Sequence, residues 1–163
     1  MDSEDAIIRE AVAPVVDDAA LRLAVSQVDP TLTAEYTRHV TAQLISAFAE
    51  LSGDFDPVHV DADYAATSHY GRLIAHGALM VGFMSTASSI LSARIAAAVG
   101  RPNLSLGYDR VRFTAPVFAD DVITTQIRIV ALQPERFRVV CDVECHNEAA
   151  QTVAVAGHLM RFV

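Results

Sequence analysis

One long uncharged stretch constrains the fold more than any other feature of this sequence. Residues 77–93 contain no charged side chain and include five hydroxyl residues. The stretch falls slightly short of the roughly 20 apolar residues that a membrane-spanning helix needs, and no basic flank or aromatic belt adjoins it. We therefore predict a helix that is buried on all sides within the protein, and we expect no membrane as a partner.

The chain after this helix has the pattern of a β-sheet. Residues 103–163 divide into four strand-like segments, separated by the turn sequences PVFADD, QPE and NEAA, and TLTAEYTRHV has the pattern of an earlier strand. Four consecutive long strands imply an antiparallel sheet, and such a sheet covers one apolar helix most simply by curling around it. The predicted class is α+β, with a long antiparallel sheet wrapped around one central helix.

Length and charge limit the domain organisation and the partners. The 163 residues fit one domain with a single core, and residues 1–30, which are acidic and rich in alanine, are expected to form an N-terminal appendage. A net charge of −8 argues against nucleic acid as a partner and favours a small molecule or another protein. The N-terminal segment has no basic or unbroken apolar stretch, so a cytoplasmic location is expected.

Two cysteines are expected to be reduced and buried. Cys141 and Cys145 lie in RFRVVCDVECHN, where apolar and polar residues alternate as in a half-buried strand. Four residues of extended chain separate them by about 13 Å, which is too far for a disulfide or a shared metal ion. They share the apolar face of the strand with Phe137, Val139 and Val143.

The segment ELSGDFDPVHVDADY, residues 50–64, concentrates five acids and one histidine. Part of this cluster has a structural explanation. Thr41 is expected to cap a helix that Gly53 ends, and Asp61 is expected to cap a short helix with Asp63 in its first turn. Asp54, Asp56 and His59 need another explanation.

Asp54 and His59 fit an acid/base pair better than the three residues together fit a metal site. Asp54 and Asp56 match the first two ligand positions of a calcium loop, but His59 and Ala65 occupy the positions that require glycine and glutamate. A transition-metal site stays open as an alternative, although no second histidine lies at ligand spacing. A glycine and a proline in the segment favour turns that bring Asp54 and His59 together, and a carboxylate and an imidazole suit a reaction that removes one proton and delivers another.

Two segments, FAELSGDFDPVH and GRLIAHGAL, together resemble the MaoC-like (R)-specific enoyl-CoA hydratases, a branch of the hot-dog superfamily. That family carries a G-D-x-N-P-x-H segment after a short helix and an A-H-G segment where its central helix begins. The matching residues here are Gly53, Asp54, Asp56, Pro57 and His59, then Ala75, His76 and Gly77. The resemblance extends over residues 36–163 and includes VRFTAPVFADD, and it departs at Asp56, where the family usually has asparagine.

The resemblance implies a reaction and a role for each matched residue. A trans-2-enoyl-CoA would gain water to form an (R)-3-hydroxyacyl-CoA, with Asp54 as the base for the water. His59 would deliver a proton to the α-carbon or share the water with Asp54. The backbone N–H of Gly77, at a helix N-terminus, would stabilise negative charge on the thioester oxygen. Further substrate contacts are expected from Asp56, Arg72, Met80 and Phe83.

The resemblance also leaves alternatives. No metal and no cofactor is expected besides the coenzyme A of the substrate, and Met80 and Phe83 also fit the pattern of plain core residues. A hot-dog thioesterase would share the fold and the ligand, but many carry a carboxylate on the central helix, and no acid occurs between Asp63 and Asp109. A non-catalytic acyl-CoA-binding subunit is a third function to test. Open sheet edges favour association, and the resemblance implies a homodimer or a dimer-based oligomer.

Overall fold

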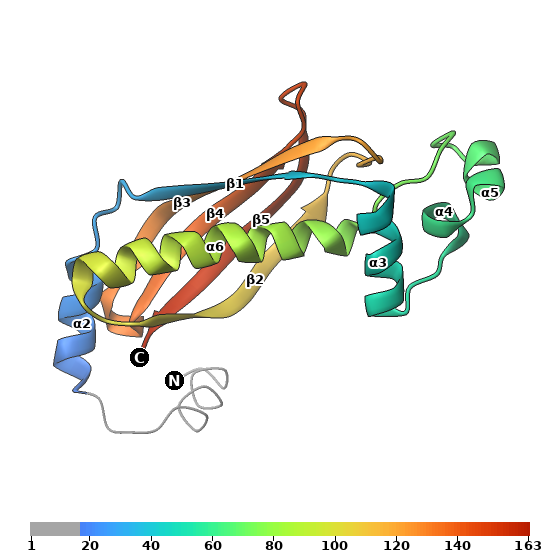
Figure 1. Ribbon diagram of the computed structural model, residues 1–163. Coiled ribbons are helices and arrows are strands. Elements are labelled where there is room, and N and C mark those ends of the chain that lie inside the picture. The colour runs from blue at the N-terminus through green and yellow to red at the C-terminus, as the bar shows by residue number, and fades with distance from the viewer. Residues whose placement is uncertain (1–16) are drawn as a thin grey trace.

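The computed structural model describes residues 17–163, which form a five-stranded sheet curled around one long helix (Figure 1). In chain order the elements are α2 (Asp18–Ser26), β1 (Thr33–His39), α3 (Ala42–Ser52), α4 (Pro57–Val60), α5 (Ala62–Thr67), α6 (Gly77–Val99), β2 (Asn103–Phe113), β3 (Val122–Gln133), the 3-10 helix η1 (Pro134–Arg136), β4 (Arg138–His146) and β5 (Thr152–Phe162). The strand order is β1-β3-β4-β5-β2, and all neighbouring strands are antiparallel. This arrangement confirms the predicted α+β class.

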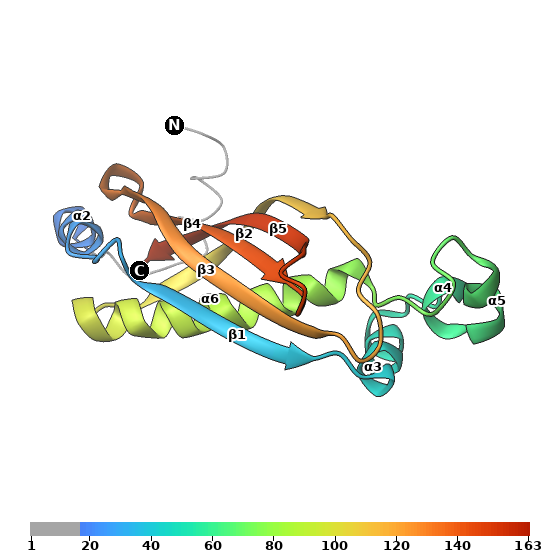
Figure 2. The same ribbon diagram turned by 90° about the horizontal axis from the view of Figure 1, so that it is seen from above.

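The short helices lie at opposite ends of the curled sheet. Figures 1 and 2 both place α3, α4 and α5 beyond the N-terminal end of α6, outside the area that the sheet covers. The same views place α2 near the C-terminal end of α6. The segment with the acidic cluster is therefore set apart from the core and meets the rest of the protein at the beginning of α6.

The helix α6 is buried on one face and exposed on the other. Its buried residues are Leu79, Met80, Phe83, Met84, Ala87, Ser88, Leu91 and Ile95. Six of its exposed residues form a stripe of small side chains, made of Ala78, Gly82, Ser85, Thr86, Ser89 and Ala93, which we call the small-residue stripe. The prediction that this helix is buried on all sides is wrong for the chain by itself, because the sheet curls around only one side of it.

The length and composition of α6 would also allow it to cross a membrane, with a mean hydropathy of 1.3 over its most apolar window. Core helices of globular proteins meet the same criteria, so the two cases are separated by packing. Here the large apolar side chains of α6 point into the concave face of the sheet, and the small-residue stripe points outward. This division is typical of a core helix.

Part of the predicted N-terminal appendage contributes to the core. Residues 1–16 lie outside the described part of the chain. The helix α2 packs against η1, where Arg22 forms an ion pair with Glu135. Its Leu21 and Val25 are buried in the same apolar cluster as α6. The apolar face of α2 thus closes the end of the core that the strands leave open.

The predicted helix ends around the acidic cluster are confirmed. The Thr41 hydroxyl accepts a hydrogen bond of 3.1 Å from the N–H of Leu44, which caps α3. Gly53 ends α3 with a φ of +77°, a left-handed conformation that favours glycine. Asp61 accepts hydrogen bonds from the N–H groups of Asp63 and Tyr64 and caps α5.

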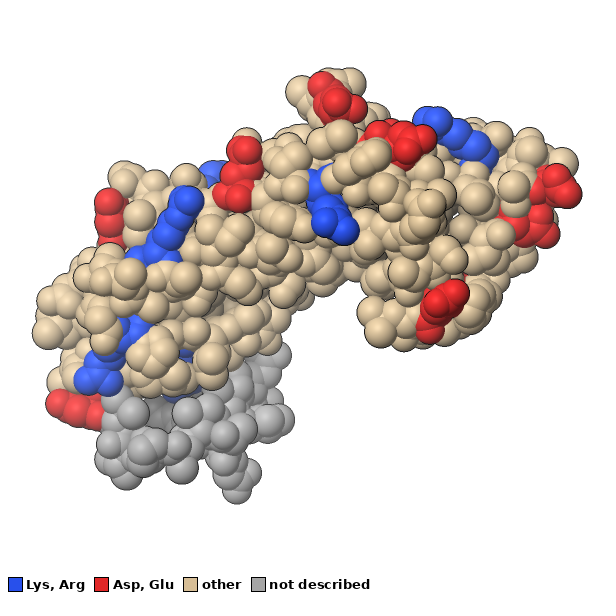
Figure 3. Space-filling view, viewed as in Figure 1, with Lys and Arg blue, Asp and Glu red and all other residues tan. Residues whose placement is uncertain are grey.

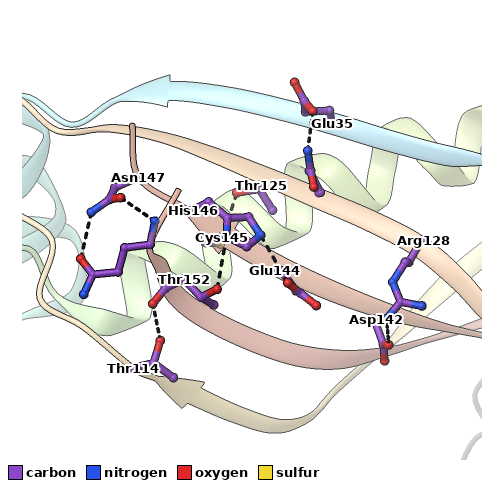
Figure 4. Close-up of polar contacts among 12 residues, drawn as sticks. Glu35, Thr114, Thr125, Arg128, Asp142, Glu144, Cys145, His146, Asn147 and Thr152 are labelled. Carbon is purple, nitrogen blue, oxygen red and sulfur yellow. Dashed lines mark hydrogen bonds and ion pairs between the residues drawn. The ribbon is translucent and has the colours of Figure 1, made fainter. Parts of the chain in front are cut away.

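Polar side chains join neighbouring strands on the outer surface of the sheet (Figure 4). Arg128 on β3 forms an ion pair of 2.6 Å with Asp142 on β4.

On β4, Cys141 and Cys145 are buried free thiols, as predicted, and burial raises the pKa of Cys141 to about 12. The Cys145 sulfur lies 3.3 Å from the hydroxyl of Thr125. These thiols are therefore protonated packing groups at neutral pH.

The first prediction tests the packing of α6. Leu91 is 0% exposed, and Leu91→Ala removes methyl groups that the surrounding core cannot replace. We expect the free energy of unfolding to fall by about 2–5 kcal/mol in urea titrations. Leu51 on α3 is 84% exposed, so the matched substitution Leu51→Ala should change the unfolding free energy by less than about 0.5 kcal/mol. Equal losses in the two variants would contradict the placement of α6 in the core.

Candidate active site

Three segments meet at the N-terminal end of α6. They are the loop that follows α3, the short helix α4, and the first turn of α6 itself (Figures 1 and 2). The loop and α4 carry the acidic cluster, whereas the first turn of α6 presents backbone N–H groups. The structure therefore brings the two halves of the sequence motif to one place.

Two successive hydrogen bonds, each between residues two positions apart, turn the loop after α3 back on itself. The carboxylate of Asp54 accepts a bond of 3.2 Å from the N–H of Asp56. The carboxylate of Asp56 in turn accepts a bond of 3.1 Å from the N–H of Val58, and Pro57 occupies the first position of α4. Asp56 is thus the N-cap of α4, a position that aspartate and asparagine fill equally well. These turns place His59 beside Asp54.

One ring nitrogen of His59 is fixed by the backbone. Its Nδ1 lies 2.8 Å from the carbonyl oxygen of Ile74, in the segment just before α6. Because a carbonyl oxygen can only accept, Nδ1 carries the proton of the neutral imidazole. The other nitrogen, Nε2, is then left as a proton acceptor.

His76 contacts both members of the predicted pair. It is buried, and its Nε2 lies 2.9 Å from the backbone carbonyl oxygen of Asp54, to which it donates. Its ring stacks on the ring of His59 with 3.8 Å between centroids and 27° between planes, and Phe48 of α3 packs on it at 5.0 Å. These contacts give His76 a packing and hydrogen-bonding role.

The carboxylate of Asp54 and the two imidazoles form a tight cluster. One ligand-type atom from each of Asp54, His59 and His76 lies within 4.8 Å of the others. The stacked rings do not favour a metal ion, because the nitrogen lone pairs lie in two nearly parallel ring planes and cannot both point at one ion. The cluster suits proton transfer better than metal binding.

The first turn of α6 presents an unpaired hydrogen-bond donor. Within residues 17–163 the N–H of Gly77 has no acceptor, and no side chain caps this helix. The N-terminal end of a helix also carries partial positive charge, so an oxyanion is stabilised there. A Cβ atom at Gly77 would lie 2.4 Å from Cδ2 of Phe113, so the ring of Phe113 packs directly against the glycine.

A hollow of about 340 Å³ lies between the start of α6 and the end of β2. We call it the site hollow. It is lined by His59, Gly77 and Met80 together with the side chains that follow β2, and Asp54, outside this lining, neighbours His59. An imidazole and a glycine whose N–H has no acceptor within residues 17–163 therefore line one partly apolar cavity, and a carboxylate lies beside the imidazole.

The other residues expected to contact substrate lie in different surroundings. Met80 lines the site hollow. Phe83 is buried one turn later and packs edge-on against Tyr36 of β1, with 6.1 Å between ring centroids, away from the lining of the hollow. Arg72 is exposed, and its guanidinium lies 3.9 Å from the ring centre of Phe118.

Two aromatic residues of the site hollow, Tyr70 and Phe113, could not be identified from the sequence. Phe113 is the last residue of β2 and is 52% exposed, and it reaches Gly77 only because β2 runs alongside α6. The segment VRFTAPVFADD indicated that this part of the chain matters, but it did not indicate the contact between Phe113 and Gly77. Knowledge of the strand register was needed to place the ring.

Charged side chains on the face shown in Figure 3 are scattered over a largely uncharged surface, and acidic groups mark the end that carries α3 and α5. In the segment 50–64 the acids occur without any lysine or arginine. Two of them, Asp56 and Asp61, are engaged as helix caps. Asp54 is the one aspartate of this segment that also neighbours two imidazoles.

Comparisons with known proteins agree with this geometry. The family model described as MaoC like domain matches residues 24–152. The chain is 33% identical over 103 residues to the (R)-specific enoyl-CoA hydratase of Aeromonas caviae, covering 63% of this chain and 72% of that protein. A second (R)-specific enoyl-CoA hydratase, from Rhodospirillum rubrum, is 33% identical over 115 residues, covering 68% and 75%. The solved structure of the R-hydratase PhaJ1 from Pseudomonas aeruginosa in its unliganded form superimposes with a TM-score of 0.69 at 30% identity, covering 85% of this chain and 84% of that one.

The second prediction tests the close approach at the start of α6. In Gly77→Ala the new methyl group must displace the ring of Phe113, so we expect the unfolding free energy to fall by about 1–3 kcal/mol. At Gly82 no atom lies within 4 Å of the position that a Cβ would occupy, so Gly82→Ala should raise the unfolding free energy by about 0.5–1 kcal/mol through helix propensity. Urea titration of both variants gives the comparison. Similar changes in the two would rule out the contact between Gly77 and Phe113.

Proposed function

Since this chain belongs to the family of MaoC-like domains and is a hydratase/dehydratase enzyme, we propose that it reversibly adds water to a trans-2-enoyl-CoA and forms an (R)-3-hydroxyacyl-CoA. The observation that carries this proposal is the cluster at the edge of the site hollow. There a carboxylate and an imidazole lie within 4.8 Å of each other, and Gly77, whose N–H has no acceptor within residues 17–163, lines the hollow together with that imidazole. Hydration of a conjugated thioester requires these three elements.

The reaction removes one proton from water and returns one proton to carbon. In our proposal Asp54 takes a proton from the water, the water oxygen bonds to C3, and the electron pair of the C2–C3 double bond moves toward the thioester carbonyl. The N–H of Gly77 donates a hydrogen bond to the thioester oxygen as its negative charge grows. The proton returned to C2 comes from the Asp54 and His59 pair, so no net proton is consumed.

The hydrogen bond between His59 and Ile74 supports one of the two roles considered for the histidine. With Nδ1–H donated to the backbone, the neutral ring presents Nε2 as an acceptor toward the hollow. It can therefore hold a hydrogen of the attacking water while Asp54 removes the other. Delivery of a proton by His59 requires that it first take one up, which the water supplies.

The remaining predicted contacts divide into substrate and structural roles. Met80 lies on the wall of the site hollow, where it can contact the first carbons of the acyl group. Arg72 is exposed over the ring of Phe118 and is the side chain that we propose to meet a phosphate of coenzyme A. Asp56 uses its carboxylate to cap α4 and Phe83 is a core residue, so we assign both a structural role.

We further propose that the active protein is a homodimer joined through β2. This strand is an edge of the sheet, and its unpaired backbone groups can pair with a second copy. Leu104 and Phe113 on this strand are 51% and 52% exposed. The small-residue stripe of α6 is exposed as well, and a second copy that joined at β2 could cover it.

The third prediction tests the proton-transfer pair. Asp54→Asn keeps the shape of the side chain but removes the base, and His59→Ala removes the acceptor for water. Each should lower kcat for the hydration of crotonyl-CoA by a factor on the order of 100 or more, with a much smaller change in KM. The assay follows loss of the enoyl absorbance together with the appearance of 3-hydroxyacyl-CoA.

Asp56→Asn is the matched control. Asparagine caps a helix as well as aspartate does, so this variant should retain activity. Dialysis against a chelator should also leave the rate unchanged. Wild-type rates in both Asp54→Asn and His59→Ala would refute the proposed mechanism, and release of free coenzyme A by the wild type would identify a thioesterase instead.

The fourth prediction concerns assembly. Sedimentation at micromolar concentration should give the mass of two or more chains, and Leu104→Asp should shift the protein toward the monomer because it places two charges near the proposed seam. Leu23 on α2 is exposed to a similar degree, 58%, so Leu23→Asp should leave the mass unchanged. A fully active monomer would contradict the dimer.

A further inference from the structure

Tyr108 of β2 forms a bridge between the sheet and the middle of α6. Its hydroxyl lies 3.1 Å from the hydroxyl of Ser88. Its ring packs on His158 of β5, with 4.6 Å between centroids and 33° between planes. His158 is completely buried, and its Nε2 lies 2.8 Å from the hydroxyl of Ser105. Tyr108 is therefore held on two sides.

Two irregularities in β2 bring this ring to the face that covers α6. The pairing with β5 shifts by one residue between Ser105 and Gly107, and again between Asp109 and Arg112. Each extra residue reverses the alternation of side chains along the strand. As a result Ser105, Tyr108 and Phe113 all face α6, although they are separated by odd numbers of residues.

Tyr108 lies between two separate hollows along α6. At one end Phe113 packs on Gly77 beside the site hollow. At the other end a second hollow of about 290 Å³, which we call the serine hollow, is lined by Ser89 of α6 and by Ser105 and His158 of the sheet, among others. The order of contacts along β2 places Tyr108 between them.

We propose that Tyr108 is the residue that limits the length of the acyl chain, and that the substrate is a short 2-enoyl-CoA of about four to eight carbons. This inference rests on the proposed hydratase function, with the thioester oxygen at Gly77. The acyl chain extends from the site hollow along α6 and ends against the ring of Tyr108. The serine hollow, whose lining includes the Tyr108 neighbours Ser85 and Ser88, then lies directly beyond the end of the substrate.

The length estimate follows from the helix. Ser85 is eight residues after Gly77, which is a rise of about 12 Å along α6 at roughly 1.5 Å per residue. Carbon–carbon bonds of about 1.5 Å advance an extended chain by roughly 1.3 Å each. The last carbon stops about 3.5 Å from the ring at van der Waals contact, so roughly six or seven bonds, or about eight carbons, fill the remaining distance.

The contacts of Tyr108 hold its ring in a fixed position at the proposed end of the acyl chain. Burial raises its pKa, although hydrogen bonds from Ser88 and Ser85 oppose that effect, so the phenol stays neutral and keeps its bond to α6. Burial also lowers the pKa of His158 to about 4, so the imidazole beneath the ring is uncharged at neutral pH. Moving the ring aside would break the hydrogen bond and the ring contact together.

The fifth prediction compares kcat/KM for 2-enoyl-CoA substrates of four, eight and twelve carbons. The wild type should hydrate the twelve-carbon substrate at least about 10-fold less efficiently than the four-carbon substrate. Tyr108→Ala joins the two hollows and should raise the twelve-carbon value about 10-fold or more relative to the four-carbon value. In Tyr108→Phe the ring remains, so the profile should stay close to that of the wild type.

Two controls locate the effect. Tyr64 on α5 is 53% exposed and lines neither hollow, so Tyr64→Ala should leave the chain-length profile unchanged. Adding Ser89→Leu to Tyr108→Ala refills the serine hollow and should abolish the gain for the twelve-carbon substrate. If Tyr108→Ala fails to fold, as judged by loss of turnover with the four-carbon substrate, Tyr108→Leu is measured in its place.

The outcomes separate the barrier from the function on which it rests. If the wild type hydrates no enoyl-CoA of any length, the proposed function fails. If it hydrates all three lengths equally well, or if folded Tyr108 variants keep the wild-type preference for short chains, the hydratase stands and the role of Tyr108 is refuted. A gain for long chains that Ser89→Leu reverses supports both.

Discussion

The burial of one face of α6 in the curl of the sheet determines where the site can form. Large apolar side chains along the helix, such as Met84 and Leu91, are fully enclosed and fix the helix along its length. The N-terminal end of the same helix extends beyond the area that the sheet covers (Figure 1), and its first residue, Gly77, lines the site hollow and has an N–H without an acceptor within residues 17–163. Packing of the core thus supplies a donor that is already in position.

His76 links that helix end to Asp54 and His59. The segment 53–64 contains no buried residue, so it has little core of its own to hold it in place. Its attachment is local and polar: the ring of His76 bonds the carbonyl of Asp54 and stacks on His59, and Ile74 accepts from His59. Since His76 directly precedes α6, the proton-transfer pair and the N–H of Gly77 are fixed relative to the same helix end.

The sequence allowed prediction of the features that depend on neighbouring residues. Thr41 and Gly53 mark the ends of α3 because capping acts within one turn, and the alternation around Cys141 and Cys145 marks β4 because side-chain direction has a period of two. The curled antiparallel sheet and the pairing of Asp54 with His59 also follow from local turns together with the family resemblance. The sequence did not allow prediction of the exposed side of α6, because small uncharged residues occur both in a buried core and on an exposed helix face.

The contacts of Tyr108 and Phe113, which sequence reasoning missed, both involve β2, and the reason is physical. Regular alternation would send Tyr108 to the opposite face from Ser105, so a pattern of period two assigns one of them wrongly. The two bulges change this direction, and at the second one Arg110 adopts a φ of +51°, which is uncommon for a residue with a side chain. Such a conformation persists only where the surrounding structure holds it, here between strand pairing on one side and the ring contacts of Tyr108 and Phe113 on the other. The irregular edge strand, and not the regular strands at the centre of the sheet, therefore gives the cavity beside α6 its shape.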